Sequence, residues 1–214
     1  MATKSFSLIV KNPIKDFKKN IKVDSDKSLS IRSFLLGAIS QEISKVENIL
    51  ESEDVFSTIQ CLKKLGVKII KKNKGKYLIY GKGLGSFFAK KKSSLNCGNS
   101  GTLARLLIGI LSTTPNINIK IHGDKSLNKR DMKKLFKLME NFGAEFYPKG
   151  KTKFPITLTS SELPIGINYE AESSAQLKSA VILAGLNSFG NTNIIEKQKS
   201  RNHTENILAR SPGV

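Results

Sequence analysis

Hydroxyl, amide and basic side chains gather at the starts of three predicted helices, at residues 24–32, 96–105 and 172–178. The middle stretch reads Asn-Cys-Gly-Asn-Ser-Gly-Thr-Leu-Ala-Arg, and its Asn, Ser and Thr side chains supply capping oxygens. Gly98 and Gly101 let a ligand approach the backbone. The unpaired N–H groups of a first helical turn and the helix dipole favour an anion there. Because each stretch also carries a cation about one turn further along, the sequence predicts one shared site for a multiply anionic ligand, with ordinary helix capping as the alternative.

A second polar set precedes later predicted helices. Residues 124–132 place Arg130 at a helix N-terminus, where its own charge opposes the helix dipole. This placement indicates a ligand anion held between Arg130 and the helix start, and a solvated arginine is the alternative. Ser200 and Arg201 stand in a similar position before the last predicted helix. The two histidines, His122 and His203, lack the spacing of a metal site, so we predict no metal.

An internal repeat puts these stretches in equivalent positions. Three apolar helical segments carry Gly37, Gly109 and Gly185, which recur at intervals of roughly 70–80 residues. Each segment is followed by a short β run and a second helix, and the first two second helices are followed by a β-hairpin. The predicted second helices are 54–65, 131–142 and 202–210, the β runs are 46–50, 117–121 and 192–195, and the hairpin strands are 67–70, 77–80, 144–147 and 156–159.

The repeating unit reads helix, strand, helix, strand, strand, which predicts a mixed α/β (α+β) fold. The first helices are apolar on most faces, as is typical of buried helices, whereas the second helices are amphipathic. Gly66, Gly143 and Gly213 follow the second helices as C-capping glycines. The third unit stops at Gly213 and Val214, where its hairpin should begin, so we expect a truncated third repeat.

The composition narrows the class of protein. The 214 residues include 36 Lys and Arg against 17 Asp and Glu, a formal charge of +19. Nucleic-acid binding is one interpretation of such a charge. However, much of the excess lies in lysine clusters at 71–76 and 90–92 in predicted turns, and only 7% of residues are aromatic, with no Trp to stack on bases. We therefore predict a solvated surface that attracts small anionic substrates.

The sequence also bears on location. It has no run of 18 apolar residues that would form a transmembrane helix, and its N-terminal apolar run is too short for a signal peptide. Cys61 and Cys97 lack a CxxC spacing, which indicates reduced thiols. We predict a cytoplasmic protein that does not bind a membrane.

Five segments, taken in order, resemble motifs of the 5-enolpyruvylshikimate-3-phosphate synthase family (3-phosphoshikimate 1-carboxyvinyltransferase). They read DKSLSIR at 26–32, CGNSGT at 97–102, GDKSLNKR at 123–130, SAQLKSA at 174–180 and SRNHTE at 200–205. Members of this family are longer and have two domains, each made of three βαβαββ units. The resemblance therefore covers the N-terminal half of such a protein.

The resemblance implies an inside-out α/β barrel-like domain of three βαβαββ repeats with buried central helices, here residues 21–214. Residues 1–20 would belong with the missing C-terminal domain. The implied reaction transfers the enolpyruvyl group of phosphoenolpyruvate to the 5-hydroxyl of shikimate 3-phosphate, in the shikimate pathway to chorismate and the aromatic amino acids. No cofactor is implied, and the full-length family is expected to be monomeric.

The resemblance also implies contacts to shikimate 3-phosphate from the first and third helix starts. Lys27 would contact both substrates and is the catalytic candidate of this chain, since the main acid and base groups would lie in the missing half. Ser28 and Arg32 would hold the shikimate hydroxyls and carboxylate. The shikimate phosphate would be held by Ser174, the Ala175 backbone and Ser200.

The second helix start would bind phosphoenolpyruvate through the Gly101 backbone together with Arg130. Gln176 would lie between the two ligands, and Asn99 and Arg105 would shape the site. In the implied mechanism, protonation of the enol carbon gives an oxocarbenium-like centre, and the hydroxyl adds to form a tetrahedral intermediate. Charged groups in a closed cleft would stabilise that intermediate.

Three places depart from the family pattern. Asp24 and Ser25 stand where Pro-Gly is usual, Ile31 where His or Asn is frequent, and Asn202 where Asp is usual. In the family, the C-terminal domain supplies acidic groups and further cations, in cis or in trans here. We expect this chain alone to bind shikimate 3-phosphate weakly and not to turn over.

Two alternatives remain at this stage. The related UDP-N-acetylglucosamine enolpyruvyl transferase shares the fold and phosphoenolpyruvate, but Lys27, Ser28 and Arg32, with the motif at 174–176, favour the shikimate enzyme. A basic nucleic-acid-binding protein is the alternative of another class. Its affinity for DNA or RNA would fall steeply with salt.

Overall fold

The computed structural model describes residues 25–90 and 93–210, so the predicted segment 1–20 and the predicted cap Gly213 lie outside the described residues. The first part of the described chain contains α1 (Lys27–Ile39), β1 (Ile43–Val46), α2 (Glu53–Lys64), β2 (Lys68–Asn73) and β3 (Lys76–Tyr80). The second contains β4 (Ser94–Asn96), α3 (Gly101–Thr113), β5 (Asn118–His122), the 3-10 turn η1 (Leu127–Lys129), α4 (Lys133–Glu140), β6 (Glu145–Tyr147) and β7 (Ile156–Thr159). The third contains β8 (Asn168–Ala171), α5 (Ala175–Gly185), β9 (Asn193–Glu196) and α6 (His203–Ala209).

The mixed α/β composition predicted from the sequence is confirmed, with two differences in the strands. The β run predicted at 46–50 lies instead at Ile43–Val46. The chain turns at Asn48, whose φ is 56°, and Ile49 then donates its N–H to Gly75 O at 3.0 Å. β4 and β8 were not predicted, because strands of three and four residues are too short to show a clear alternating pattern.

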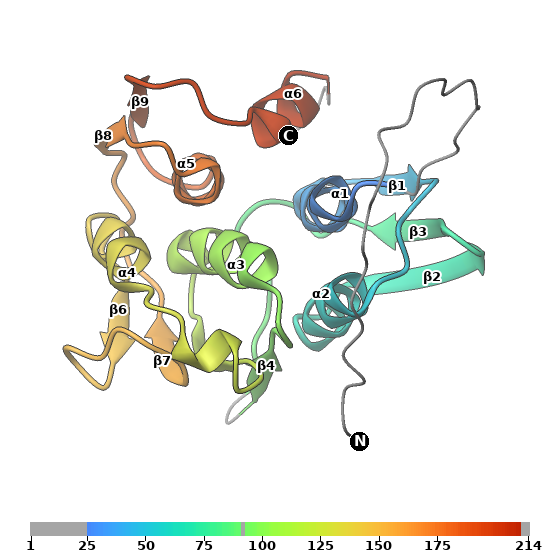
Figure 1. Cartoon of the computed structure of the whole chain (residues 1–214), viewed down its shortest axis with the longest axis horizontal. Helices are drawn as coiled ribbons and strands as arrows, with labels where there is room; N and C mark the ends of the chain where they lie inside the picture. The colour runs from blue at the N-terminus through green and yellow to red at the C-terminus, as the bar shows by residue number, and fades with distance from the viewer. Residues whose placement is uncertain (1–24, 91–92, 211–214) are drawn as a thin grey trace, which may run out of the picture.

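The helices α1, α3 and α5 lie in the interior of the molecule, and the strands lie toward its outside (Figure 1). The described strands form a sheet in the order β1-β3-β2, a sheet in the order β4-β5-β7-β6 and a pair of β8 with β9. The pairs β4–β5 and β8–β9 are parallel, so α3 and α5 are the crossover helices that connect them. Each crossover leads from the carboxyl end of a strand into an apolar helix, which is where the predicted anion-binding stretches lie.

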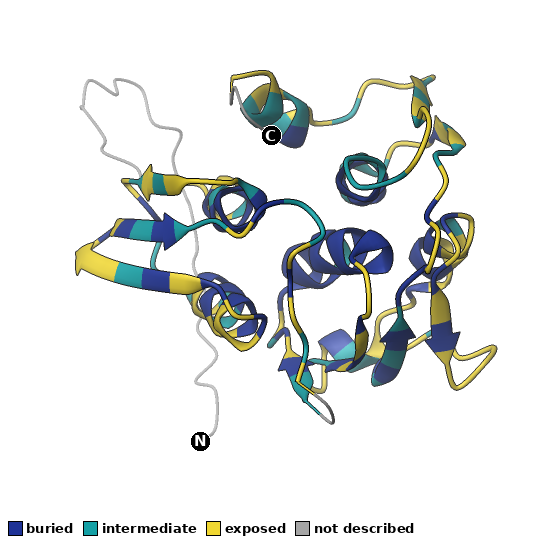
Figure 2. Cartoon of the chain, turned by 180° about the vertical axis from the view of Figure 1, so that it is seen from behind, coloured by how far each residue is buried: buried dark blue, intermediate teal, exposed yellow. Residues whose placement is uncertain are grey.

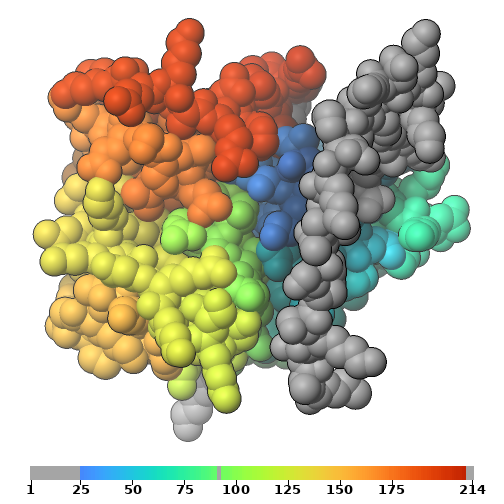
Figure 3. Space-filling model, viewed as in Figure 1, coloured from blue at the N-terminus to red at the C-terminus, as the bar shows by residue number. Residues whose placement is uncertain are grey.

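Helix α3 forms the centre of the hydrophobic core. Twelve of its thirteen residues are buried, and the exception is Arg105 in its second turn. Figure 2 shows α3 in dark blue over nearly its whole length, and Figure 3 shows little of this green segment at the surface. Because burial of a Leu or Ile side chain contributes about 1.5–3 kcal/mol, this helix is a major source of stability.

Helices α3 and α5 approach closely at Gly109. A β-carbon added to Gly109 would lie 2.5 Å from Ala180 O and 2.9 Å from Ala180 Cα, so a side chain at this position would collide with the α5 backbone. Only glycine permits this spacing. The contact fixes α5 against α3 and, through it, the relative positions of their N-termini.

The capping glycines predicted for the first two of the second helices are confirmed, but α4 is shorter than expected. Gly66 and Gly143 follow α2 and α4 with φ of +88° and +91°, the conformation of a C-capping glycine. Helix α4 begins at Lys133 rather than at Asp131, whose Oδ1 accepts a hydrogen bond from Lys133 N at 2.9 Å. Within the described part, no helix has the length and apolarity required to cross a membrane.

Cys61 and Cys97 are free thiols buried in the core. A hydrogen bond with Cys61, together with burial, raises the pKa of the Cys97 thiol well above its ordinary value. The Cys97 thiol is therefore protonated near neutral pH.

Glu51 joins the first sheet to the loop before α2. Its carboxylate accepts hydrogen bonds from Gly75 N, Tyr77 Oη and Lys71 Nζ, each at 2.8 Å. The backbone hydrogen bond from Gly75 and those from the Lys71 and Tyr77 side chains lower the pKa of Glu51 to about 2. These bonds hold the tip of the β2–β3 hairpin against the chain that follows β1.

The Gly109–Ala180 contact predicts that Gly109→Ala destabilises the protein. Alanine is the better helix former by about 1 kcal/mol, but the collision with the α5 backbone forces the helices apart, at a cost typical of overpacking of about 1–3 kcal/mol. Gly37→Ala is the matched control, because a β-carbon there would meet only side chains, Ile79 Cδ1 at 3.0 Å and Ser44 Cβ at 3.1 Å. Chemical denaturation should show a larger loss for Gly109→Ala, and equal stability of the two variants would contradict this packing.

The Glu51 bonds predict a pH-dependent contribution to stability. The folded-state pKa of about 2 lies below the ordinary value of 4.5, so the contribution is present above about pH 4.5 and is lost as the pH falls toward 2. The difference in unfolding free energy between wild type and Glu51→Gln should therefore shrink between pH 6 and pH 3. Glu47→Gln is the control, because Glu47 is 68% exposed and, among the described residues, forms an ion pair only with Lys76, at 3.0 Å. A difference for Glu51→Gln that stays constant with pH would refute the role assigned to this carboxylate.

Candidate anion-binding site at three helix N-termini

Three central helices begin at one pocket. This pocket, of about 380 Å³, is lined by Lys27 at the start of α1, Gly101 at the start of α3 and Gln176 in the first turn of α5. Each helix N-terminus presents N–H groups without intrahelical partners and the positive end of a helix dipole. The structure thus brings together residues from all three stretches singled out in the sequence. The other lining residues are Glu53, Asp54, Asn99, Thr102 and Arg130.

The three helix starts carry the same type of cap. The side chains of Asp26, Ser100 and Ser174 each accept a hydrogen bond from the backbone N–H three residues further on, at 2.7, 3.2 and 3.4 Å. Such a cap satisfies one of the four N–H groups of the first turn. Asn99 and Thr102, expected from the sequence as further caps, instead bond to other side chains.

Two guanidinium groups lie over Gly101. A β-carbon at Gly101 would lie 2.7 Å from Arg105 Nη1 and 2.8 Å from Arg130 Nη1, so glycine leaves the space that both groups occupy. Among the described residues, no salt bridge joins either arginine to a carboxylate. Burial lowers the pKa of Arg105, and the charge of Arg130 lowers it further. Two like charges at a helix N-terminus favour an anion bound beside them.

Gln176 connects α5 to α3 at the pocket. Its Oε1 accepts a hydrogen bond from Arg105 Nη1 at 2.8 Å, and its Nε2 donates to Thr102 Oγ1 at 3.0 Å. Arg105 Nη1 also donates to Gly101 O at 3.2 Å. The amide therefore holds the Arg105 guanidinium beside Gly101, at the start of α3.

Arg130 reaches the pocket by a different route from the one predicted. The sequence placed it at the N-terminus of the following helix, but it follows the 3-10 turn η1 and precedes α4 by three residues. Its charge at the end of a helical turn is therefore not opposed by a dipole. Its Nη2 donates to Asn99 Oδ1 at 2.6 Å, which directs the guanidinium toward the start of α3.

Lys27 faces acidic residues that the sequence argument missed. Its Nζ forms an ion pair with Asp54 Oδ2 at 2.9 Å, and its side chain remains 50% exposed. Glu53 and Asp54 form the first turn of α2 and line the same pocket. The available signal was their position, since acidic residues are favoured in a first helical turn. The pocket thus contains carboxylates as well as cations.

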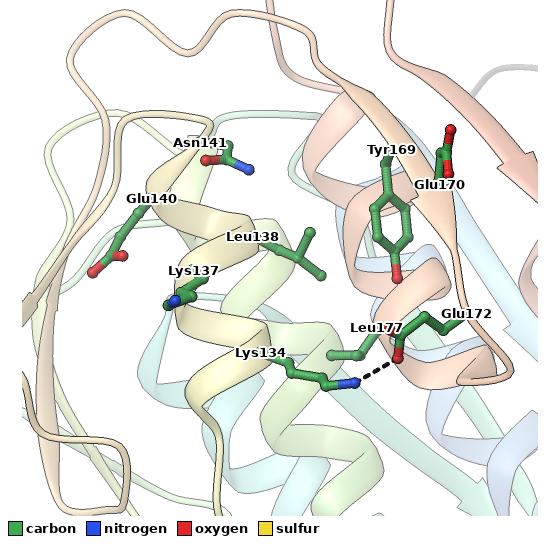
Figure 4. A pocket seen from close by; sticks show the side chains of 9 residues that line it. All are labelled: Lys134, Lys137, Leu138, Glu140, Asn141, Tyr169, Glu170, Glu172 and Leu177. Atoms are coloured by element: carbon green, nitrogen blue, oxygen red, sulfur yellow. Dashed lines mark hydrogen bonds and ion pairs between the residues drawn. The ribbon is translucent and has the colours of Figure 1, made fainter.

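Two further pockets lie along α4. One, of about 350 Å³, is lined by Arg105, Ser174 and Gln176, so it continues the site past Gln176. The next, of about 390 Å³, shares Lys134 and Glu172 with it, and these two side chains form an ion pair at 2.5 Å. Figure 4 shows this pair and the other side chains that line the pocket, which come from α4 and β8, from the residue that follows each of them, and from α5. None of the predicted site residues lines that outer pocket.

Arg32 is directed into the protein. It is 4% exposed, its Nε donates to Thr204 Oγ1 at 2.8 Å, and its Nη2 donates to Ser179 Oγ at 3.1 Å. Its Nη1 donates to Ser28 O at 3.2 Å. Burial lowers the pKa of Arg32, and the nearby carboxylates, Glu205 first, oppose this effect. Neither Arg32 nor Ser28 lines the pockets described above.

Ser200 is held by a partly buried ionic cluster around Lys178. Its N and Oγ both donate to Glu196 Oε1, at 2.7 and 2.6 Å. The same oxygen lies 2.8 Å from Lys178 Nζ, whose side chain is 3% exposed and which also pairs with Glu205 Oε1 at 2.6 Å. Ala175 is the first residue of α5, directly after the cap Ser174.

The arrangement suits small ligands that carry several negative charges. Helix N-termini, the two guanidinium groups beside Gly101 and an exposed lysine would bind phosphate or carboxylate groups, and amide and hydroxyl groups would orient them. Within the described residues, no group of three or more His, Cys, Asp or Glu side chains is placed to hold a metal ion.

Comparisons with known proteins agree with this chemistry. The chain is 39% identical over 188 residues to the 3-phosphoshikimate 1-carboxyvinyltransferase of Ruegeria sp. (strain TM1040), covering 87% of this chain and 41% of the relative. It is 40% identical over 202 residues to that of Desulforamulus reducens, covering 94% of this chain and 46% of the relative. The structure of EPSP synthase from Acinetobacter baumannii superimposes with a TM-score of 0.81 at 37% identity, over 88% of this chain and 42% of that one.

The chain therefore spans less than half the length of these relatives. The model of one protein family, EPSP synthase (3-phosphoshikimate 1-carboxyvinyltransferase), matches residues 11–212. With nearly the whole chain matched, this protein belongs to the EPSP synthase family.

Proposed function

We propose that this chain supplies the N-terminal half of an enolpyruvyl transferase site, which binds shikimate 3-phosphate and phosphoenolpyruvate. The observation that carries the proposal is the convergence of three helix N-termini on one pocket, with Arg105 and Arg130 over Gly101. Both substrates carry phosphate and carboxylate groups, which this positive surface attracts. The family match supports the choice of these substrates.

The proposal also includes the fold of the domain that forms this half of the site. Residues 21–214 form an inside-out α/β barrel-like domain of three βαβαββ units, in which the third is incomplete. The two-strand pair β8–β9, beside described sheets of three and four strands, supports this interpretation. Because the relatives are more than twice as long, a second domain, in cis or in trans, completes the site and pairs with residues 1–20. The complete enzyme acts as a cytoplasmic monomer without a cofactor.

Phosphoenolpyruvate binds at the start of α3 in this proposal. The Gly101 N–H, Arg105 and Arg130 hold its negative groups, and Asn99 keeps Arg130 in place through the bond to its guanidinium. Gln176 lies between this ligand and the second one, since it bonds to α3 from the first turn of α5.

Shikimate 3-phosphate binds between the starts of α1 and α5. Arg32 has five N–H groups, and the bonds described above use three of them, which leaves two for the ligand carboxylate. An anion there would also compensate the desolvation of this buried cation. The Ser28 hydroxyl takes part in holding the shikimate ring. The phosphate is held by Ser174, the Ala175 N–H and Ser200.

In the proposed reaction, the 5-hydroxyl of shikimate 3-phosphate adds across the double bond of phosphoenolpyruvate, and phosphate is then eliminated. A proton adds to the methylene carbon of phosphoenolpyruvate, and the 5-oxygen loses its proton as it bonds to the adjacent carbon. The bond to the phosphate oxygen then breaks, and loss of a methyl proton restores the double bond. Lys27 lies where it can touch both ligands, and the cations of this chain stabilise the negative groups that are brought together.

The proposal predicts which ligand the isolated chain binds. Calorimetry should detect weak binding of shikimate 3-phosphate and none of UDP-N-acetylglucosamine. No phosphate should be released when both substrates are added, because the second domain is needed for proton transfer. Preference for UDP-N-acetylglucosamine would overturn the choice of substrate, as would a salt-sensitive affinity for RNA that shikimate 3-phosphate does not displace. Phosphate release by the purified chain would show that it is catalytically complete.

The space over Gly101 predicts the effect of a single methyl group. In Gly101→Ala, the new β-carbon displaces both guanidinium groups, because it would lie within 3 Å of each of their nearest nitrogens. Affinity for phosphoenolpyruvate should fall about 10-fold, or about 1.4 kcal/mol, in an NMR titration. Gly37→Ala, in α1 and outside the residues that line the pocket, is the control and should change the affinity less than twofold. Equal phosphoenolpyruvate affinity in wild type and Gly101→Ala would disprove this placement.

A further inference from the structure

Lys178 is a buried cation that the proposed reaction does not use. It lies in α5 one turn after Ser174, and its N–H bonds to Ser174 O at 3.1 Å. Its side chain is 3% exposed and bridges Glu196 at the end of β9 to Glu205 in α6. Burial alone would lower the pKa of Lys178, but the bonds to Glu196 and Glu205 outweigh it, so the pKa is raised and the lysine is charged.

The hydroxyl of Ser200 has one proton, and it is already engaged. It donates that proton to Glu196 Oε1 at 2.6 Å, which leaves only lone pairs facing outward. A phosphate dianion accepts hydrogen bonds and does not donate them. Ser200 can therefore bind a phosphate only if its proton turns away from Glu196 toward the ligand.

Lys178 makes that exchange feasible. When the Ser200 O–H turns away from Glu196, Glu196 Oε1 still accepts hydrogen bonds from Ser200 N at 2.7 Å and from Lys178 Nζ at 2.8 Å. The positive charge of Lys178 also offsets the negative charge of Glu196, which would otherwise repel a phosphate beside Ser200. The bonds from Lys178 first, and then those from Ser200, lower the pKa of Glu196 to about 2, so it remains ionised throughout.

We infer that Lys178 is a positioning residue: it neutralises Glu196 and so allows Ser200 to turn its hydroxyl proton from Glu196 to the phosphate of the substrate. This inference rests on the proposed function, because it takes Ser200 to contact the ligand phosphate. Lys178 itself does not reach the ligand. It acts through Glu196. Glu205 pairs with the same lysine but, among the described residues, forms no hydrogen bond to Ser200.

Two double variants of the full 214-residue chain test the inference. Lys178→Met/Glu196→Gln and Lys178→Met/Glu205→Gln each remove one positive and one negative charge. In the second variant Glu196 remains charged beside Ser200 without its lysine, whereas in the first variant that carboxylate is gone. Affinity for shikimate 3-phosphate should stay within about threefold of wild type in the first and fall about 10-fold in the second. Shikimate itself, titrated in the same way, should bind both variants alike. This difference would not arise if Lys178 only stabilised the fold.

Single variants that keep Lys178 give an independent measurement if the double variants do not fold, as judged by circular dichroism. Glu196→Gln should strengthen shikimate 3-phosphate binding several-fold, whereas Glu205→Gln, which leaves the Ser200 contacts intact, should change it less. If the two double variants, or the two single variants, bind shikimate 3-phosphate equally tightly while wild type still binds it, the inference is overturned and the proposed function stands. Failure of wild type to bind shikimate 3-phosphate overturns the proposed function as well.

Discussion

The contact between α3 and α5 at Gly109 is the constraint on which the site depends. Because the backbone of Ala180 lies where a β-carbon of Gly109 would be, the two helices run closer than side chains would allow. That approach puts Gln176 within hydrogen-bond distance of Arg105 and Thr102. Arg105 is the one residue of α3 that is not buried, because the other twelve lie in the core.

This construction carries an electrostatic cost that an anionic ligand would offset. Like charges and the positive ends of three dipoles are held together by apolar contacts that lie behind them in the core. The protein compensates part of this charge with Glu53 and Asp54 at the start of α2. It leaves Arg105 and Arg130 without a carboxylate among the described ion pairs. Hydrophobic burial thus supplies the free energy that offsets the repulsion between these positive groups and holds them in place in the absence of an anion.

The sequence predicted the central helices well, because an apolar pattern on all faces and a capping residue at a fixed offset are both local signals. It did not predict that Arg130 follows a 3-10 turn, since one helical turn and the start of a longer helix look alike in sequence. The inward direction of Arg32 and the cluster around Lys178 depend on contacts with α6, more than 20 residues away from Lys178. The signal in the sequence for the Lys178 cluster was a lysine within an otherwise apolar helix. The roles of individual residues toward the two substrates remain predictions.

The bonds from Arg32 to Thr204 and Ser179 join the first described helix to α6 across 172 residues and to α5 across 147 residues. Arg32 has no partner from α6 until Thr204 has been synthesised, although α1 lies early in the chain. Contacts of such long range are characteristic of slow folding. The bonds that fix the polar end of α1 thus depend on segments that leave the ribosome much later than α1 does.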